Sequence, residues 1–139
     1  MTVVELLKRL AETSETAVVV TDAGIVAPGP TILYVNPAFT RMTGYSAEEV
    51  VGRSPRMLQG ERTSRLVLRQ LSRALRAGKP FEGCVTNYRK SGEDYLCQVE
   101  IEPLVNASGE IEHFVAFERE VKRRRGRPAK RALSRFVAV

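Results

Sequence analysis

The residues of this chain best suited to bind another molecule are arginines in its middle third. Arg56 stands alone, and further arginines return at the three- to four-residue spacing of a helix: Arg62, Arg65, Arg69, Arg73 and Arg76. Guanidinium groups form paired hydrogen bonds with phosphate oxygens, so Arg56, Arg69 and Arg73 are candidates for holding a phosphate. The same spacing also describes a helix face that is simply solvated, and the sequence leaves both interpretations open.

Other reactive side chains are few. Cys84 and Cys97 form no CxxC pattern and are predicted to be free thiols in a reducing compartment, so we expect a cytoplasmic protein. His113, the single histidine, provides too little for a histidine-based metal site or a Ser-His-Asp triad. We therefore expect neither a metal nor an enzymatic activity.

The C-terminal segment carries most of the positive charge. Residues 122–139 contain eight Lys and Arg and no acidic residue, which leaves 14 basic and 16 acidic residues, a net charge of −2, in residues 1–121. The overall charge of +6 therefore belongs to a tail and not to a basic domain. A tail of this composition can be a general polyanion binder or can have no partner.

Part of this tail resembles an AT-hook, a short peptide that binds DNA, and the resemblance is carried by Arg124, Arg125, Gly126, Arg127 and Pro128. It implies that Arg125 and Arg127 enter the minor groove of A·T-rich DNA, where the potential is most negative. Gly126 would let the backbone lie deep in the groove, and Pro128 would keep the chain extended. A short amphipathic helix is predicted over residues 129–139.

Local signals divide residues 1–121 into helices and strands of one domain. Apolar spacing predicts an amphipathic helix over residues 3–11, which either covers the core of its own domain or forms a dimer contact. Capping residues and prolines predict short helices after Asn36, Ser46 and Ser54, and a longer helix over 63–77. β-Branched and alternating segments predict five strands, over residues 17–22, 31–35, 81–90, 94–105 and 110–121.

This order indicates an α+β fold with a five-stranded antiparallel sheet and short helices packed on one face. Such an arrangement leaves a pocket between the sheet and the helices, which is a common place for a small ligand. No apolar run approaches the roughly 20 residues of a membrane span.

Several motifs of residues 16–121 resemble PAS domains: Tyr34-Val35-Asn36-Pro37-Ala38-Phe39, Thr43-Gly44-Tyr45-Ser46, and Asn87-Tyr88-Arg89-Lys90-Ser91-Gly92. Residues 52–60, Gly-Arg-Ser-Pro-Arg-Met-Leu-Gln-Gly, are similar to the flavin-binding segment of LOV blue-light receptors, which usually reads Gly-Arg-Asn-Cys-Arg-Phe-Leu-Gln-Gly. The resemblance implies a PAS/LOV-like sensor domain over 16–121 that binds FMN in its pocket. An N-terminal segment, 1–15, and the tail, 122–139, would flank it.

The resemblance places flavin-binding positions of the family on Ser54, Arg56, Gln59, Asn87, Cys97 and Glu118. It places the second phosphate-binding arginine of the family on Ser72, so the flanking Arg69 and Arg73 are the candidates for that role. The photoactive cysteine of the family corresponds to Pro55, which has no sulfur, so a cysteine–flavin bond cannot form there. Cys97 and Glu118 stand where the family has Asn and Gln. An ionised Glu118 only accepts hydrogen bonds, so it needs a raised pKa to donate to a flavin carbonyl.

Two functions follow as hypotheses. The first is a flavin-based sensor of blue light or redox state, without cysteine–flavin chemistry, that is joined to a DNA-binding tail. The second is a cofactor-free PAS domain that serves as a dimerisation scaffold. Both predict a homodimer, and the helix at 3–11 is the candidate for part of its contact.

Overall fold

The computed structural model describes residues 1–123 and 136–138 of the chain. The AT-hook-like residues Arg124, Arg125, Gly126, Arg127 and Pro128 lie outside this range. The elements are α1 (Val3–Ala11), β1 (Ala17–Asp22), β2 (Ile32–Val35), α2 (Pro37–Thr43), α3 (Ala47–Val50), a 3-10 turn η1 (Pro55–Leu58), α4 (Arg65–Arg76), β3 (Phe81–Tyr88), β4 (Asp94–Val105), β5 (Ile111–Arg123) and β6 (Phe136–Ala138).

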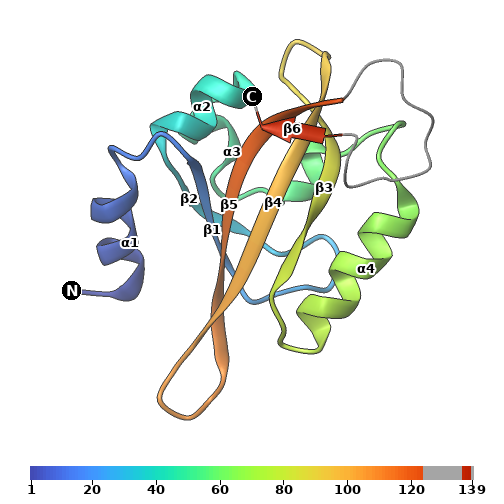
Figure 1. The fold of residues 1–139 in the computed structure, drawn as a ribbon. Helices are drawn as coiled ribbons and strands as arrows, with labels where there is room; N and C mark the ends of the chain where they lie inside the picture. The colour runs from blue at the N-terminus through green and yellow to red at the C-terminus, as the bar shows by residue number, and fades with distance from the viewer. Residues whose placement is uncertain (124–135, 139) are drawn as a thin grey trace.

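The strands form one antiparallel sheet in the order β2-β1-β5-β4-β3 (Figure 1). This confirms the predicted α+β fold and its five strands. The prediction of a helix over residues 129–139 is wrong at residues 136–138, because these residues form β6 and pair with β5. The pairing has a physical reason: the first residue of β1, Ala17, pairs with Glu118, and β6 pairs with the backbone of β5 beyond that point.

Local capping begins and ends the helices where the sequence predicts. Asn36 caps α2 ahead of Pro37, and Gly44 ends it with a φ of 81°, a left-handed conformation that favours glycine. The capping box on α3 and the cap on η1 are confirmed as well. Helix α4 begins later than predicted because Ser64 is its cap, while the buried Thr63 hydroxyl donates to the Thr86 carbonyl at 2.7 Å.

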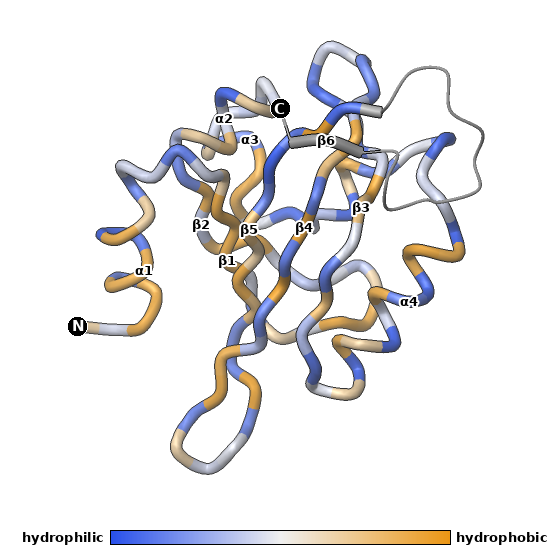
Figure 2. The backbone as a smooth tube through the Cα atoms, in the orientation of Figure 1, coloured by the Kyte–Doolittle hydropathy of each residue, from blue (hydrophilic) through white to orange (hydrophobic). Residues whose placement is uncertain are grey.

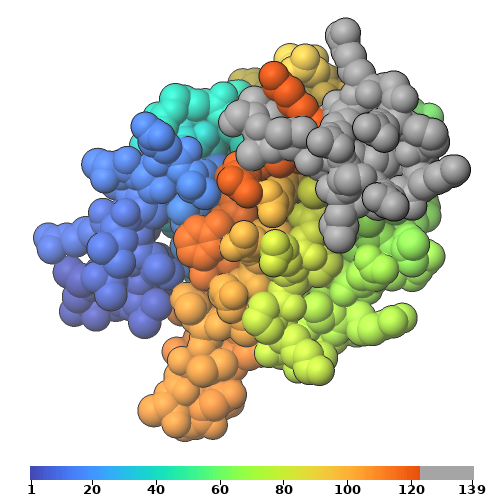
Figure 3. All heavy atoms as spheres, viewed as in Figure 1, coloured from blue at the N-terminus to red at the C-terminus, as the bar shows by residue number. Residues whose placement is uncertain are grey.

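The two faces of the sheet are covered differently (Figures 1 and 2). The inner face, with Val19 and Val99, packs under α2, α3, η1 and α4. Helix α1 lies against the outer face, where Leu7 and Ala11 contact residues such as Val18 and Val115. Of the two roles left open for α1, the structure therefore shows that it covers its own core. The remainder of the outer face carries side chains of β4 and β5 between α1 and α4 (Figure 3).

Candidate functional site

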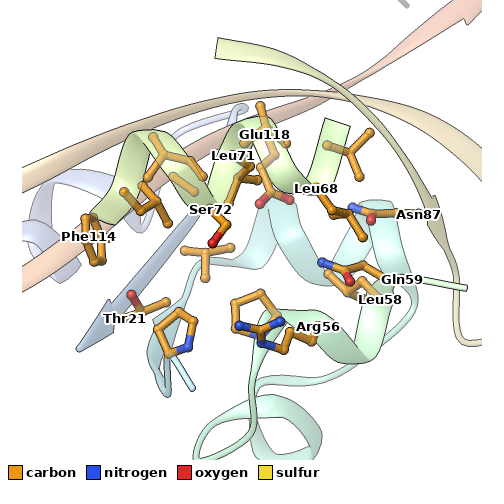
Figure 4. Close-up of a pocket in the computed structure, with 18 of the residues that line it drawn as sticks. Thr21, Arg56, Leu58, Gln59, Leu68, Leu71, Ser72, Asn87, Phe114 and Glu118 are labelled. Atoms are coloured by element: carbon orange, nitrogen blue, oxygen red, sulfur yellow. The ribbon is translucent and has the colours of Figure 1, made fainter. Parts of the chain in front are cut away.

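A cavity of about 150 Å³ lies between the inner face of the sheet and the helical side of the domain. The strands contribute alternate residues to it, because successive side chains of a strand point to opposite faces. Helix α4 and η1 close it from the other side (Figure 4). Its lining is mainly apolar and includes Val19, Ile25, Leu58, Leu68, Leu71, Val85 and Phe114.

Four of the eight predicted flavin-binding residues line this cavity: Arg56, Gln59, Asn87 and Glu118. They come from η1, the residue after η1, β3 and β5, so only the tertiary fold brings them together. In Figure 4 the Glu118 carboxyl group and the amides of Gln59 and Asn87 point toward one cavity, whose remaining lining is mainly apolar. Such a site fits a flat, largely apolar ring that carries hydrogen-bonding groups along one edge.

The other four predicted residues lie outside the lining. Ser54 accepts a hydrogen bond from the Arg56 amide at 3.2 Å and so caps η1. Arg69 and Arg73 are exposed, although Ser72 between them lines the cavity. Cys97 is fully buried in the core beside Glu118.

Glu118 is the unusual ionisable group of this site. It is only 7% exposed, and burial raises its pKa to about 7, whereas the adjacent Cys97 thiol lowers it slightly. The thiol in turn has a pKa held far above its ordinary value by burial and by Glu118. Near neutral pH the carboxyl group therefore exists in both forms, and its protonated form can donate a hydrogen bond into the cavity.

Arg56 has a role that the sequence did not predict. Its Nε donates to the Gly29 carbonyl at 2.8 Å and its Nη2 donates to the Ile25 carbonyl at 3.2 Å. Both carbonyls belong to the loop between β1 and β2, which also contributes Ile25 and Pro30 to the lining. The guanidinium group therefore fastens this loop over the cavity and retains further N–H groups for an anion.

Sequence reasoning missed Thr21, Phe114 and Tyr95. Thr21 and Phe114 line the cavity, but no alternation identifies them, because β1 is buried on both faces and Phe114 is followed by the equally buried Val115. Tyr95 lies opposite Asn87 across β3 and β4, with the Arg89 guanidinium 4.3 Å from its ring centre. Among the described residues its buried hydroxyl has no hydrogen-bond partner, and burial raises its pKa. A local pattern cannot reveal such a contact.

The family model for the PAS domain matches residues 16–123. The chain belongs to the PAS domain family. This PAS domain is 42% identical over 94 residues to a blue-light-activated histidine kinase of Brucella canis, a match covering 68% of this chain and 19% of the kinase. It is 34% identical over 112 residues to a nitrogen fixation regulatory protein of Klebsiella oxytoca, covering 81% and 22% of the two chains. The chain thus spans about a fifth of these relatives.

Solved structures similar to this PAS domain include LOV domains. One, studied with a flavin analogue, has a TM-score of 0.77 and 27% identity, covering 84% of this chain and 85% of the other. The LOV domain of the Erythrobacter litoralis EL346 blue-light-activated histidine kinase has a TM-score of 0.69 and 33% identity, covering 76% and 94%. An RNA-binding light-oxygen-voltage receptor has a TM-score of 0.75 and 30% identity, covering 85% and 33%. In the described part of the PAS domain, no helix is long and apolar enough to cross a membrane.

Proposed function

We propose that this PAS domain is a flavin-based sensory module, responsive to blue light or redox state, that works without a cysteine–flavin bond. The observation that carries the proposal is the apolar cavity with Gln59, Asn87 and Glu118 in its lining. Pro55 also lines the cavity at the position that corresponds to the photoactive cysteine of LOV domains. The blue-light-activated relatives and LOV neighbours support a light or redox signal.

Bound FMN would supply the light absorption and electron acceptance that no side chain of this chain provides. The amides of Gln59 and Asn87 can each donate and accept, so they suit the carbonyl and N–H groups of the flavin edge. Glu118 would donate to a carbonyl when it is protonated and would repel it when ionised. Arg56, at the cavity wall, would take the phosphate, with Arg69 and Arg73 as further candidates.

Flavin binding requires the cavity to widen. Pockets that enclose small-molecule ligands are commonly about 300–1,000 Å³, and this cavity measures about 150 Å³. The inward side chains of α4, Leu68 and Leu71, are half-buried, whereas the opposite wall is the continuous sheet. We therefore expect α4 and the loop held by Arg56 to move outward when a ligand enters.

The absorption spectrum of the purified protein, before and after incubation with FMN, tests this proposal. A structured blue band supports it, and Ala116→Leu, which fills the cavity, should abolish that band while the protein stays folded. Ala107→Leu, in the exposed turn between β4 and β5, is the matched control and should retain it. A colourless protein that takes up no FMN would contradict the proposal and favour the cofactor-free scaffold.

We further propose a homodimer, whether or not a flavin is bound. Val3, Leu6 and Leu10 of α1 are 50%, 47% and 69% exposed, although Leu7 and Ala11 of the same helix pack on the sheet. A second copy could cover these side chains together with the partly exposed Phe117 on the outer face. Light scattering should show that Leu6→Glu/Leu10→Glu is monomeric, while the control Val51→Glu/Val105→Glu remains dimeric.

The basic tail remains a proposed DNA-binding segment of a cytoplasmic protein. Its support is the Arg125-Gly126-Arg127-Pro128 motif and the absence of acidic residues from 122–139. Arg125→Ala/Arg127→Ala should weaken binding to A·T-rich duplexes more than to G·C-rich ones. The control Lys130→Ala/Arg135→Ala should weaken both equally. Equal binding of the wild-type protein to both duplexes would contradict the AT-hook interpretation.

A further inference from the structure

Helix α4 carries two different faces. Its inner face provides Leu68, Leu71, Ser72 and Leu75 to the cavity. Its outer face carries exposed arginines at positions i, i+4, i+8 and i+11: Arg65, Arg69, Arg73 and Arg76. At 3.6 residues per turn these positions fall within about 80° of one another and extend roughly 16 Å along the helix. We call these four residues the arginine stripe.

The charge of the arginine stripe is not neutralised by its surroundings. Among the described residues there are four ion pairs, and none of them involves a stripe arginine. Helix α4 contains no acidic residue. Within residues 1–123 the stripe makes one side-chain hydrogen bond, from Arg76 Nε to the Ser72 hydroxyl at 3.2 Å. Residues 122–139 cannot neutralise it with acidic side chains either, because they have none.

Part of the arginine stripe opposes the stability of its own helix, although Arg73 and Arg76 stand in the last turn, where the helix dipole favours basic residues. Arg65 stands in the first turn, where the helix dipole favours acidic residues. The pairs Arg65–Arg69 and Arg69–Arg73 are like charges four residues apart, an arrangement that destabilises helices. A helix face that is only solvated can carry charges of both signs. Folding alone therefore does not account for four arginines on one face of a helix that has no acidic residue.

We propose that the arginine stripe binds the phosphodiester backbone of a nucleic acid. Arginines four residues apart are about 6 Å apart along the helix axis, close to the roughly 6.8 Å that separates alternate phosphates of one DNA strand along the duplex axis. Guanidinium groups form paired hydrogen bonds with phosphate oxygens. Insertion into a membrane is disfavoured, because the apolar face of α4 is directed into the cavity. This surface is separate from the tail motif, and it shares only Arg69 and Arg73 with the candidates for the flavin phosphate.

The experiment measures binding of the full chain to a 25-base-pair DNA duplex and to an RNA duplex of the same length, at two salt concentrations. Arg65→Gln/Arg69→Gln/Arg73→Gln should weaken binding at least tenfold and reduce the slope of log K against log salt by roughly two to three. The matched control is Arg9→Gln/Arg41→Gln/Arg53→Gln, which removes the same charge from exposed sites on the rest of the domain. It should weaken binding less than threefold.

Both triple variants are repeated with Arg125→Ala/Arg127→Ala, so that loss of the tail motif is distinguished from loss of the stripe. Thermal melting checks that each variant is folded, and glutamine is a good helix former. The two duplexes identify which nucleic acid is bound. Equal weakening of duplex binding by both triple variants, or no weakening by either, would overturn the proposal. Binding to vesicles of phosphatidylcholine and phosphatidylserine is measured in parallel. A loss of binding that is seen only on these vesicles would overturn the proposal as well.

Discussion

The thiol of Cys97 donates to the Glu118 carboxyl group, with Sγ 3.8 Å from Oε1, between the adjacent strands β4 and β5. Both side chains are buried, and a thiol is a weak donor that compensates little of the cost of burying a charge. The pair therefore places a carboxyl group with a pKa of about 7 at the wall of an apolar cavity. Its protonation state is the chemical variable of this site.

Glu118→Gln should remove a pH dependence from folding. Because the pKa of Glu118 is raised in the folded protein, the folded state keeps its proton at pH values where the unfolded chain has lost it. The free energy of unfolding therefore falls as the pH rises from about 4.5 to about 7, and this contribution is constant above that range. The full difference is on the order of 3 kcal/mol. Urea unfolding at pH 5 and pH 8 should show this loss in the wild type and in the exposed control Glu112→Gln, but not in Glu118→Gln.

We expect Pro55→Cys to introduce cysteine–flavin photochemistry, which the proposed function of the wild type does not use. The substitution puts a thiol at a lining position of the cavity while Ser54 still caps η1. In protein loaded with FMN, blue light should then bleach the flavin band, which recovers in the dark. Ser54→Cys moves the thiol to a neighbouring position outside the lining and should not bleach. Full reversible bleaching of the wild type would contradict the prediction and point to Cys97.

Arg56→Gln should loosen the loop between β1 and β2 and leave global stability within about 1 kcal/mol, because Arg56 is exposed. The variant loses the bonds to the Gly29 and Ile25 carbonyls, which are links between this loop and η1. Amide hydrogen exchange over residues 24–31 should accelerate several-fold. The neighbouring Arg53→Gln is the control, and an equal acceleration there would contradict the role given to Arg56.

Asn36→Ala should be among the most damaging single substitutions. Asn36 is 1% exposed; its Oδ1 accepts from the Val18 and Phe39 amides, and its Nδ2 donates to the Ala11 and Thr16 carbonyls. Four buried hydrogen bonds of about 1 kcal/mol each predict a loss of roughly 3–5 kcal/mol in the free energy of unfolding.

Asn36→Asp provides the internal control for that prediction. It keeps the accepting oxygen that caps α2 but loses the two donated bonds that hold the end of α1 and the start of β1. The carboxylate oxygen that replaces Nδ2 faces the Ala11 and Thr16 carbonyl oxygens in a buried site, so urea unfolding should place this variant at or below the stability of Asn36→Ala. Equal stability of Asn36→Asp and the wild type would show that the contacts to α1 and β1 contribute nothing.

Short-range signals in the sequence were sufficient to predict the short helices and the strands of the sheet. Asn36, Ser46 and Ser54 cap the segments that follow them because a side-chain oxygen reaches a backbone amide two or three residues away. Alternation along β4 separates a buried from a more exposed face within a single strand. These signals are short-range, so they predicted the five-stranded sheet, and the motifs between them indicated a PAS domain.

The roles of the predicted site residues depend on contacts between segments that are distant in the chain. Arg56 meets carbonyls 27 and 31 residues earlier in the chain, and Glu118 meets a thiol 21 residues away. Arg69 and Arg73 face outward because the neighbouring leucines of α4 take the side toward the cavity. The burial of a carboxyl group, and therefore its pKa, depends on every element that packs around it. A local sequence pattern does not specify which elements those are.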